Sequence, residues 1–247
     1  MPDNLSGAII AAGRGERLRP ATGALPKPLV EVGGETLLER QVRLMIAVGL
    51  ARIHVIVNSE TAGLMEQKRM TLPDQVALQV ANTPNSMESL LRLGEAIPAG
   101  RFLLTTVDTI VDETEFRSFF ARAQDITSSA GNAGGYEGAL GVVEWSGDKK
   151  PLFVRVSSDD QITRFDDPEQ KIVTAGVYFL STRVFAHALE ARARKLDALR
   201  RYLALLVERG HRLAAVRMKD VMDIDEPADL ELARRRETRR ISGGRAE

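Results

Sequence analysis

The 247-residue chain is predicted to be an α/β protein with a mostly parallel sheet covered by helices on both faces. Short apolar runs alternate with helical segments in the first half, and the first run leads directly into glycines and cations. Hydrophobic residues make up 44% and charged residues 28%, as in ordinary globular proteins. The length suits one large domain or one domain with an inserted subdomain.

The first half supplies the alternation of strands and helices. The helix after Thr36 carries a capping-box pattern with Glu39, turns an apolar face inward and ends at Gly49. Pro98 and Gly100 close a second helix. Strands are predicted at 7–10, 53–57, 76–81 and 102–107, and this second helix at 86–97.

The second half is predicted to be richer in strands. Residues 127–138 contain many Ser and Gly residues and are predicted to form a mobile loop. A helical segment is expected at about 183–208, and a C-terminal helix near Pro227. The predicted strands are 139–145, 152–157, 162–165, 173–180 and 213–218.

The segment after the first strand is predicted to form a phosphate-binding loop. Glycine lets the backbone approach phosphates closely, and successive amides form an anion-binding concavity. Arg17 and Lys27 would add positive charge to this loop. The residues expected to bind the nucleotide are Ala11, Ala12, Gly13, Arg14 and Gly15.

Two commoner glycine motifs are excluded. The third glycine of a Rossmann fingerprint is replaced by Leu18, and no Gly-Lys-Ser or Gly-Lys-Thr triplet occurs. Pro20 and Pro26 exclude a helix that begins at Gly15 and runs on. An extended loop over about 13–27 is expected instead.

These residues resemble a known family. The pattern Gly13-x-Gly15-x-Arg17-Leu18-x-Pro20-x-Thr22, followed by Pro26-Lys27-Pro28-Leu29, is similar to the signature of the sugar-phosphate nucleotidyltransferases. Their fold is shared with cytidylyltransferases of phosphorylated alcohols such as phosphocholine. The resemblance implies a three-layer, Rossmann-like NTP-transferase fold with a mixed, mostly parallel sheet. It also implies one domain over 1–232, with a nucleotide-binding half (1–126) and a β-rich acceptor-binding half (127–232).

The resemblance implies Mg²⁺ held by two carboxylates. Asp108 follows an apolar strand at the edge where α/β sheets bind ligands, and the family has a metal-binding acid there. Asp225 matches the later aspartate of the family's Asp-x-Asp pattern, with Asp223 in reserve. Taken alone, Asp108 could cap a turn and Asp225 could cap the last helix.

Base recognition is assigned to the segment after the strand at 76–81. Asn82, Thr83 and Ser86 can offer hydrogen bonds to a base, but turn and helix-cap roles explain the same residue types equally well. The glycine that relatives often carry here is absent.

Acceptor recognition is assigned to Gly176, Tyr178 and Arg164. Ala175-Gly176-Val177-Tyr178 matches the family's Ala-Gly-x-Tyr, whereas Asp166-Asp167-Pro168 stands where relatives of the hexose 1-phosphate type often carry Glu-Lys. This departure keeps a phosphorylated alcohol open as the acceptor. Further candidates for phosphate contacts are Lys149, Lys150 and Lys171.

The predicted reaction is attack by an acceptor phosphate on the α-phosphorus of an NTP, with release of pyrophosphate. Arg17 and Lys27 would hold the β- and γ-phosphates and stabilise developing charge. No catalytic base is needed, because a phosphate is already ionised at neutral pH. The leading acceptor is a sugar phosphate. The alternatives are a phosphocholine-like alcohol phosphate and a non-catalytic nucleotide sensor.

Composition excludes several other classes of protein. Lys plus Arg and Asp plus Glu both number 34, so no basic field indicates nucleic acid. The chain has no cysteine, and its three histidines lack metal-ligand spacing. With no signal peptide or membrane-spanning run recognised, a cytoplasmic enzyme is predicted, and homo-oligomer formation is left open. The arginine-rich tail at 233–247 is expected to fray as a solvated helix end.

Overall fold

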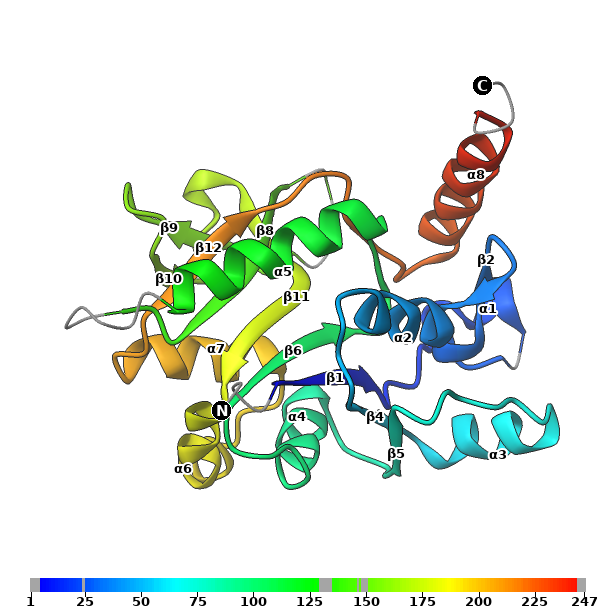
Figure 1. Cartoon of the computed structure of the whole chain (residues 1–247), viewed down its shortest axis with the longest axis horizontal. Coiled ribbons are helices and arrows are strands. Elements are labelled where there is room, and N and C mark those ends of the chain that lie inside the picture. The colour runs from blue at the N-terminus through cyan, green and yellow to red at the C-terminus, as the bar shows by residue number, and fades with distance from the viewer. Residues whose placement is uncertain (1–4, 24, 129–134, 146, 148–150, 244–247) are drawn as a thin grey trace.

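The structure, a computed structural model, describes residues 5–23, 25–128, 135–145, 147 and 151–243. Its centre is a seven-stranded sheet (Figure 1). The strands are β1 (Leu5–Ala11), β4 (Ile53–Val57), β5 (Val76–Val80), β6 (Arg101–Thr106), β8 (Gly138–Glu144), β11 (Ile172–Ser181) and β12 (Leu213–Arg217). They lie in the order β12-β8-β11-β6-β1-β4-β5.

Strand directions make the sheet mixed and mostly parallel, as predicted. β1 pairs in parallel with β4 and β6, β4 with β5, and β8 with β12. β11 alone among these strands runs antiparallel to its two neighbours, β6 and β8. Three two-stranded ladders join β2 (Glu31–Val32) with β3 (Glu35–Thr36), β7 (Thr109–Ile110) with β13 (Met222–Asp223), and β9 (Val154–Val156) with β10 (Ile162–Phe165).

Helices cover both faces of the sheet and complete a three-layer fold. The α-helices are α1 (Arg19–Thr22), α2 (Leu37–Ala47), α3 (Ser59–Gln67), α4 (Ser86–Gly94), α5 (Glu113–Ser128), α6 (Ala188–Ala193), α7 (Leu199–Glu208) and α8 (Pro227–Gly243). Short 3-10 helices lie at η1 (Lys27–Leu29), η2 (Pro168–Gln170) and η3 (Thr182–His187). Within the described residues, no helix is long and apolar enough to cross a bilayer.

Two hydrophobic clusters form the core, one on each face of the sheet. Buried residues of α2, α3, α5 and α8 belong to one cluster, and those of α4, α6 and α7 to the other. Figure 1 shows α2 and α5 on the opposite side of the sheet from α4 and α7. Successive residues of β1 alternate between the clusters, with Ile9 in the first and Ile10 in the second. This two-sided burial explains why β1 reads as a continuous apolar run.

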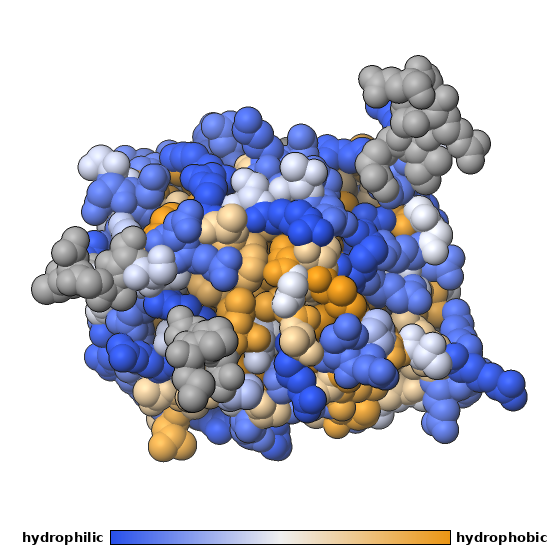
Figure 2. All heavy atoms as spheres, in the orientation of Figure 1, coloured by the Kyte–Doolittle hydropathy of each residue, from blue (hydrophilic) through white to orange (hydrophobic). Residues whose placement is uncertain are grey.

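Hydrophobic side chains also reach the surface of the molecule. Figure 2 shows them gathered in the middle of one face, surrounded by hydrophilic side chains. Partly buried hydrophobic residues pack against both core clusters, so the core extends outward between the helices. The described surface is otherwise largely charged, with many ion pairs between exposed side chains.

The structure corrects two sequence-based boundaries. The helix predicted at 183–208 is divided into η3, α6 and α7, and the break between α6 and α7 contains Lys195 in a left-handed conformation with φ of 54°. The predicted mobile loop begins too early, since Thr127 and Ser128 end α5 and Thr127 is buried. Residues 129–134 of that loop lie outside the described residues.

The tail that is expected to fray from residue 233 continues as part of α8 as far as Gly243. Ala233 is buried, and Glu237 forms an ion pair with Arg40 of α2. Packing and an ion pair to the body of the protein therefore stabilise this part of the helix. Residues 244–247 lie outside the described residues.

His54 in β4 is expected to make the free energy of unfolding depend on pH. Its side chain is buried, and neither ring nitrogen has a hydrogen-bond partner among the described residues. Burial, with the charge of Arg52, lowers its pKa from 6.5. The unfolded chain therefore binds more protons than the folded chain below about pH 6.5. As pH falls through this range, His54 should reduce the free energy of unfolding by up to about 1.4 kcal/mol per pH unit.

Urea unfolding of the wild type and His54→Leu between pH 5 and pH 8 tests this expectation. The leucine variant should lose less stability on acidification, because it has no ring to protonate. Parallel pH profiles for the two proteins would show that His54 is not responsible.

Candidate active site

A short ladder beyond the main sheet brings two distant carboxylates together. β7 follows β6 directly and pairs with β13, so that Thr109 lies opposite Asp223. The amide of Ile224 also donates a hydrogen bond of 3.0 Å to the carbonyl oxygen of Asp108. Asp108 comes just before β7 and Asp225 comes just after β13, so both lie at the same end of this ladder. Their carboxylates therefore meet near the end of β6.

The ammonium group of Lys27 lies between these carboxylates. Its Nζ is 2.8 Å from Oδ2 of Asp108 and 2.9 Å from Oδ1 of Asp225. Lys27 comes from η1, and its side chain is only 10% exposed. The other oxygen of Asp225 accepts from Arg17 at 3.0 Å. The structure thus brings together the four charged residues that the sequence assigned to catalysis and metal binding.

Mutual attraction keeps Lys27 and Asp108, which are partly buried, charged. Burial by itself would lower the pKa of Lys27, but the charges of Asp108 and Asp225 outweigh it and raise the pKa. Burial would likewise raise the pKa of Asp108, yet the charge and hydrogen bond of Lys27 hold it below the usual range. Both groups are therefore ionised at neutral pH, and the site has fixed charges of both signs.

Asp223 adds a third carboxylate beside the pair. Its side chain is open to water, but surrounding protein removes part of its hydration. This desolvation and the charge of Asp108 raise the pKa of Asp223 to about 7. Thr109 donates a hydrogen bond to it at 3.0 Å.

The loop after β1 passes beside Lys27. Gly15 has φ of 61°, and a Cβ atom there would lie 2.8 Å from Cβ of Lys27, so glycine is required at this crossing. Asn58, which sequence reasoning missed, donates to the carbonyl oxygen of Ala12 at 3.1 Å and also caps α3. No hydrogen bond between described residues uses the amides of residues 13–17 as donors. These amides are available to a bound anion.

A cleft of about 700 Å³ connects the carboxylates with the second half of the chain. It is lined by six of the predicted site residues: Arg17, Ser86, Asp108, Gly176, Tyr178 and Asp225. Asp223, Thr106, Arg200 and Arg236 also line it. Sequence reasoning missed Thr106 and both of these arginines, because only the fold brings their segments to the cleft.

The residues assigned to base recognition have partners within the protein. Asn82 accepts from the amide of Ser59 at 3.0 Å, and Thr83 shares a hydrogen bond of 2.6 Å with Ser89. Oγ of Ser86 accepts from the amide of Leu199 at 2.9 Å. Contact of Asn82, Thr83 and Ser86 with a base stays a prediction.

Of the three residues assigned to acceptor recognition, two line the cleft and one does not. Gly176 lies at an irregularity in the pairing of β11 with β8, and Tyr178 is buried in the wall of the cleft. Arg164 does not line this cleft. Its side chain is 71% exposed, and its guanidinium group lies 4.0 Å from Oδ2 of Asp167. Lys171 is exposed and also outside the lining, and Lys149 and Lys150 lie outside the described residues.

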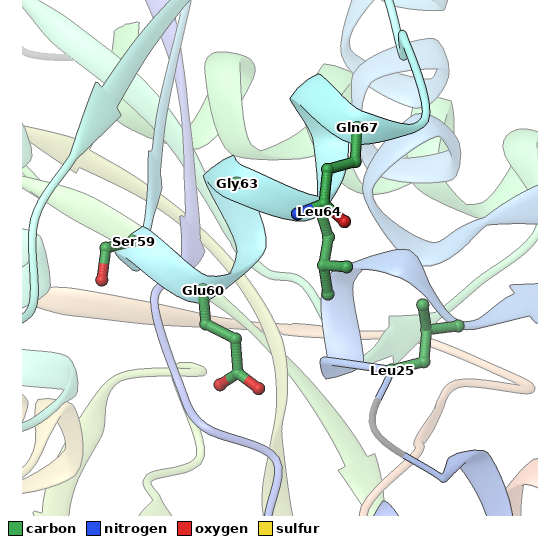
Figure 3. Close-up of a pocket in the computed structure, with 6 residues that line it drawn as sticks. All are labelled: Leu25, Ser59, Glu60, Gly63, Leu64 and Gln67. Atoms are coloured by element: carbon green, nitrogen blue, oxygen red, sulfur yellow. The ribbon is translucent and has the colours of Figure 1, made fainter.

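A second hollow lies between α3 and the segment after α1 (Figure 3). Leu64 points from α3 toward Leu25. Glu60, at its edge, pairs with Arg19 at 3.0 Å. Six of the predicted site residues line the larger cleft and none lines this hollow, so the larger cleft is the candidate active site.

The fold and this charged cleft agree with a comparison against known families. The model of the family described as nucleotidyl transferase matches residues 6–239. The chain belongs to the nucleotidyl transferase family. The family resemblance inferred from the sequence is thereby confirmed, and with it the class of transferases for phosphorus-containing groups to which the family belongs.

Curated relatives of this nucleotidyl transferase are distant. A probable mannose-1-phosphate guanylyltransferase of Arabidopsis thaliana is 25% identical over 90% of this chain and 62% of the relative. An N-acetylmuramate α-1-phosphate uridylyltransferase of Neisseria meningitidis is 26% identical over 48% of this chain and 52% of the relative. A 2-aminoethylphosphonate cytidylyltransferase of Lancefieldella rimae is 26% identical over 42% of this chain. This last match covers only 43% of the relative's own length.

Solved structures show the same fold along most of the chain. The inositol-1-phosphate CTP transferase of T. maritima has a TM-score of 0.73 at 19% identity, covering 92% of this chain and 94% of that protein. The CTP:phosphocholine cytidylyltransferase of Streptococcus pneumoniae has a TM-score of 0.74 at 18% identity, covering 94% and 98%. At these identities the likeness shows the fold alone.

Proposed function

We propose that this nucleotidyl transferase joins an NMP group from an NTP to a phosphorylated small molecule, with a sugar phosphate as the leading acceptor, and releases pyrophosphate. The observation that carries the proposal is the convergence of Arg17, Lys27, Asp108 and Asp225 beside a loop with available amides. Relatives named for mannose 1-phosphate and N-acetylmuramate 1-phosphate support the sugar phosphate.

The loop and the cations would bind the triphosphate. The amides of residues 13–17 can donate to its oxygens, and Arg17 and Lys27 would neutralise negative charge on it. Lys27 also holds Asp108 and Asp225 in position through its two hydrogen bonds. Oriented charges of this kind stabilise a transition state without rearranging during the reaction.

The carboxylates fit a magnesium ion. The described residues contain no ready-made cage of three or more acidic or histidine side chains. Mg²⁺ is usually bound by one or two carboxylates together with water and substrate phosphates, and Asp108 and Asp225 are such a pair. When bound, the ion would neutralise phosphate charge and align the reacting groups.

The acceptor would approach from the part of the cleft lined by Gly176 and Tyr178. An oxygen of its phosphate forms a bond to the α-phosphorus, and the bond from that phosphorus to the oxygen bridging the α- and β-phosphates breaks. Pyrophosphate leaves with the electron pair of that bond. The acceptor phosphate is ionised at neutral pH, so no side chain has to remove a proton.

Pyrophosphate release from the full chain tests this function. CTP, UTP, GTP and dTTP are each incubated with Mg²⁺ and with glucose 1-phosphate, mannose 1-phosphate or phosphocholine. We expect release that requires both a nucleotide and an acceptor, greatest with a sugar phosphate. A preference for phosphocholine would favour the alcohol-phosphate alternative. Nucleotide binding without release for every pair would indicate a sensor.

A further inference from the structure

Helix α8 presents one face to the core and another to the cleft. Leu230 and Ala233 are 1% and 2% exposed and belong to a core cluster. Ala228, Leu232 and Arg236 follow one another at intervals of four residues and line the cleft. Leu232 is 45% exposed, so this face offers both an apolar side chain and a cation to whatever enters.

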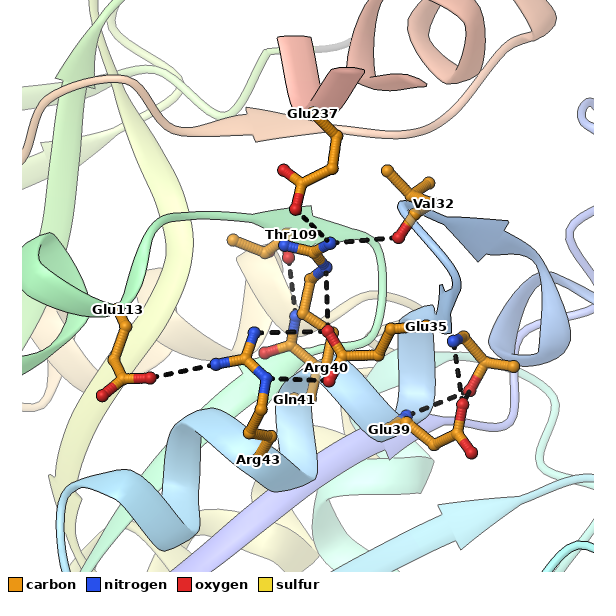
Figure 4. A network of polar contacts seen from close by, with 10 residues as sticks. Val32, Glu35, Glu39, Arg40, Gln41, Arg43, Thr109, Glu113 and Glu237 are labelled. Carbon is orange, nitrogen blue, oxygen red and sulfur yellow. Dashed lines mark hydrogen bonds and ion pairs between the residues drawn. The ribbon is translucent and has the colours of Figure 1, made fainter. Parts of the chain in front are cut away.

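Polar contacts fix the orientation of α8 (Figure 4). Glu237 points down toward Arg40 of α2, at 3.5 Å, and Arg40 also donates to the carbonyl oxygen of Val32 at 3.1 Å. Arg40 is 5% exposed. Glu237 also packs closely on Gly33. A Cβ atom added to Gly33 would lie only 2.4 Å from Cγ of Glu237. Because α8 is held on the β2–β3 hairpin in this way, the face that carries Arg236 is directed toward the cleft.

Arg200 enters the same cleft from the other face of the sheet. It lies in the first turn of α7, whose buried residues belong to the second core cluster. The hydrogen bond from the amide of Leu199 to Ser86 joins the start of α7 to the start of α4. The cleft therefore has an arginine on each of two walls, contributed by helices on opposite faces of the sheet.

These two arginines differ from Arg17 in their partners. Arg17 is paired with Asp225 at 3.0 Å. Within the part of the chain that the structure describes, neither Arg200 nor Arg236 forms an ion pair or a side-chain hydrogen bond, and both are exposed in the cleft. A guanidinium group matches the geometry of carboxylates and phosphates. Because these two guanidinium groups stand on two different walls of the cleft and neither is paired with an acid, they favour a ligand with an anionic group toward each wall.

We propose that the acceptor carries a second anionic group, a carboxylate or a further phosphate, in addition to the phosphate that attacks. Arg200 and Arg236 bind these two groups, and Leu232 contacts the apolar skeleton between them. This inference rests on the proposed transfer reaction, in which the loop, Arg17 and Lys27 serve the nucleotide. It narrows the acceptor to an acidic phosphoester, such as the 1-phosphate of an acidic sugar.

Calorimetric binding of two matched ligands tests the inference. Glucose 1-phosphate and glucuronic acid 1-phosphate share the ring and the phosphate and differ by one carboxylate. The wild type should bind glucuronic acid 1-phosphate at least about tenfold more tightly than glucose 1-phosphate. The double variant Arg200→Gln/Arg236→Gln should bind the two ligands with nearly equal affinity. Its melting temperature should be unchanged, because neither side chain has a partner to lose.

Arg235→Gln is the matched control. Arg235 neighbours Arg236 on α8 but pairs with Glu231 and lies outside the cleft lining, so this variant should keep the full preference. Equal affinity of the wild type for both ligands, or a preference that persists in the double variant, would overturn the second-anion site. Because binding is measured without turnover, the transfer reaction is judged separately, and it fails only if no NTP releases pyrophosphate with either of these two ligands as acceptor.

Discussion

Replacing Asp108 with asparagine should lower the rate of nucleotidyl transfer by at least about 10²–10³-fold. The amide is nearly the same size as the carboxylate but carries no negative charge. It therefore removes one of the two groups that would hold Mg²⁺, and it leaves the ammonium group of Lys27 with Asp225 as its partner. Pyrophosphate release under saturating nucleotide and acceptor measures this loss.

The matched control for this variant is Asp74→Asn, which makes the same chemical change at an exposed position outside the cleft. It should keep wild-type activity. Circular dichroism and thermal melting should show that Asp108→Asn remains folded, with a lower melting temperature because a partly buried ion pair is weakened. Full activity in folded Asp108→Asn would remove this residue from the metal site.

Replacing Gly176 with alanine should lower the free energy of unfolding by about 2–5 kcal/mol. Gly176 has φ of 68°, a conformation that costs an alanine about 1–2 kcal/mol. The added Cβ would also lie 2.0 Å from Oγ1 of Thr109 and 2.9 Å from Oγ1 of Thr106. Backbone strain and steric overlap therefore act together, in a strand that lines the cleft. Urea unfolding measures the effect.

Gly210→Ala separates the two causes. Gly210 has φ of 83°, but no atom lies within 4 Å of a Cβ placed there. This variant should lose only the conformational part, about 1–2 kcal/mol. Equal losses at the two positions would show that Thr109 moves aside freely and that close packing at Gly176 is unimportant.

Local patterns in the sequence predict most of the sheet. β10 and the start of α8 are placed at the predicted residues, and β8 and β12 lie within one residue of their predicted bounds. The capping box of Thr36 and Glu39 is present at α2, with both hydrogen bonds formed. These features depend on residues close together in the chain, so composition and periodicity are sufficient to find them.

Other elements depend on distant contacts and have weak local signals. The break between α6 and α7 occurs at Lys195, without a glycine or proline to mark it. The ladder of β7 with β13 is two residues long on each side, and each half becomes a strand only through the other. α8 continues past residue 233 because Glu237 meets Arg40 of α2, which no local pattern could reveal.

The sequence by itself determined the α/β class, the loop after β1 and the identity of the charged residues, because each is written in neighbouring residues. Only the tertiary structure decided how these residues meet. It placed Lys27 between Asp108 and Asp225, through a ladder between segments far apart in the chain. It also brought Arg200 and Arg236 to one cleft, from helices on opposite faces of the sheet. Distances between such segments follow from packing of the whole core, and no local pattern contains them.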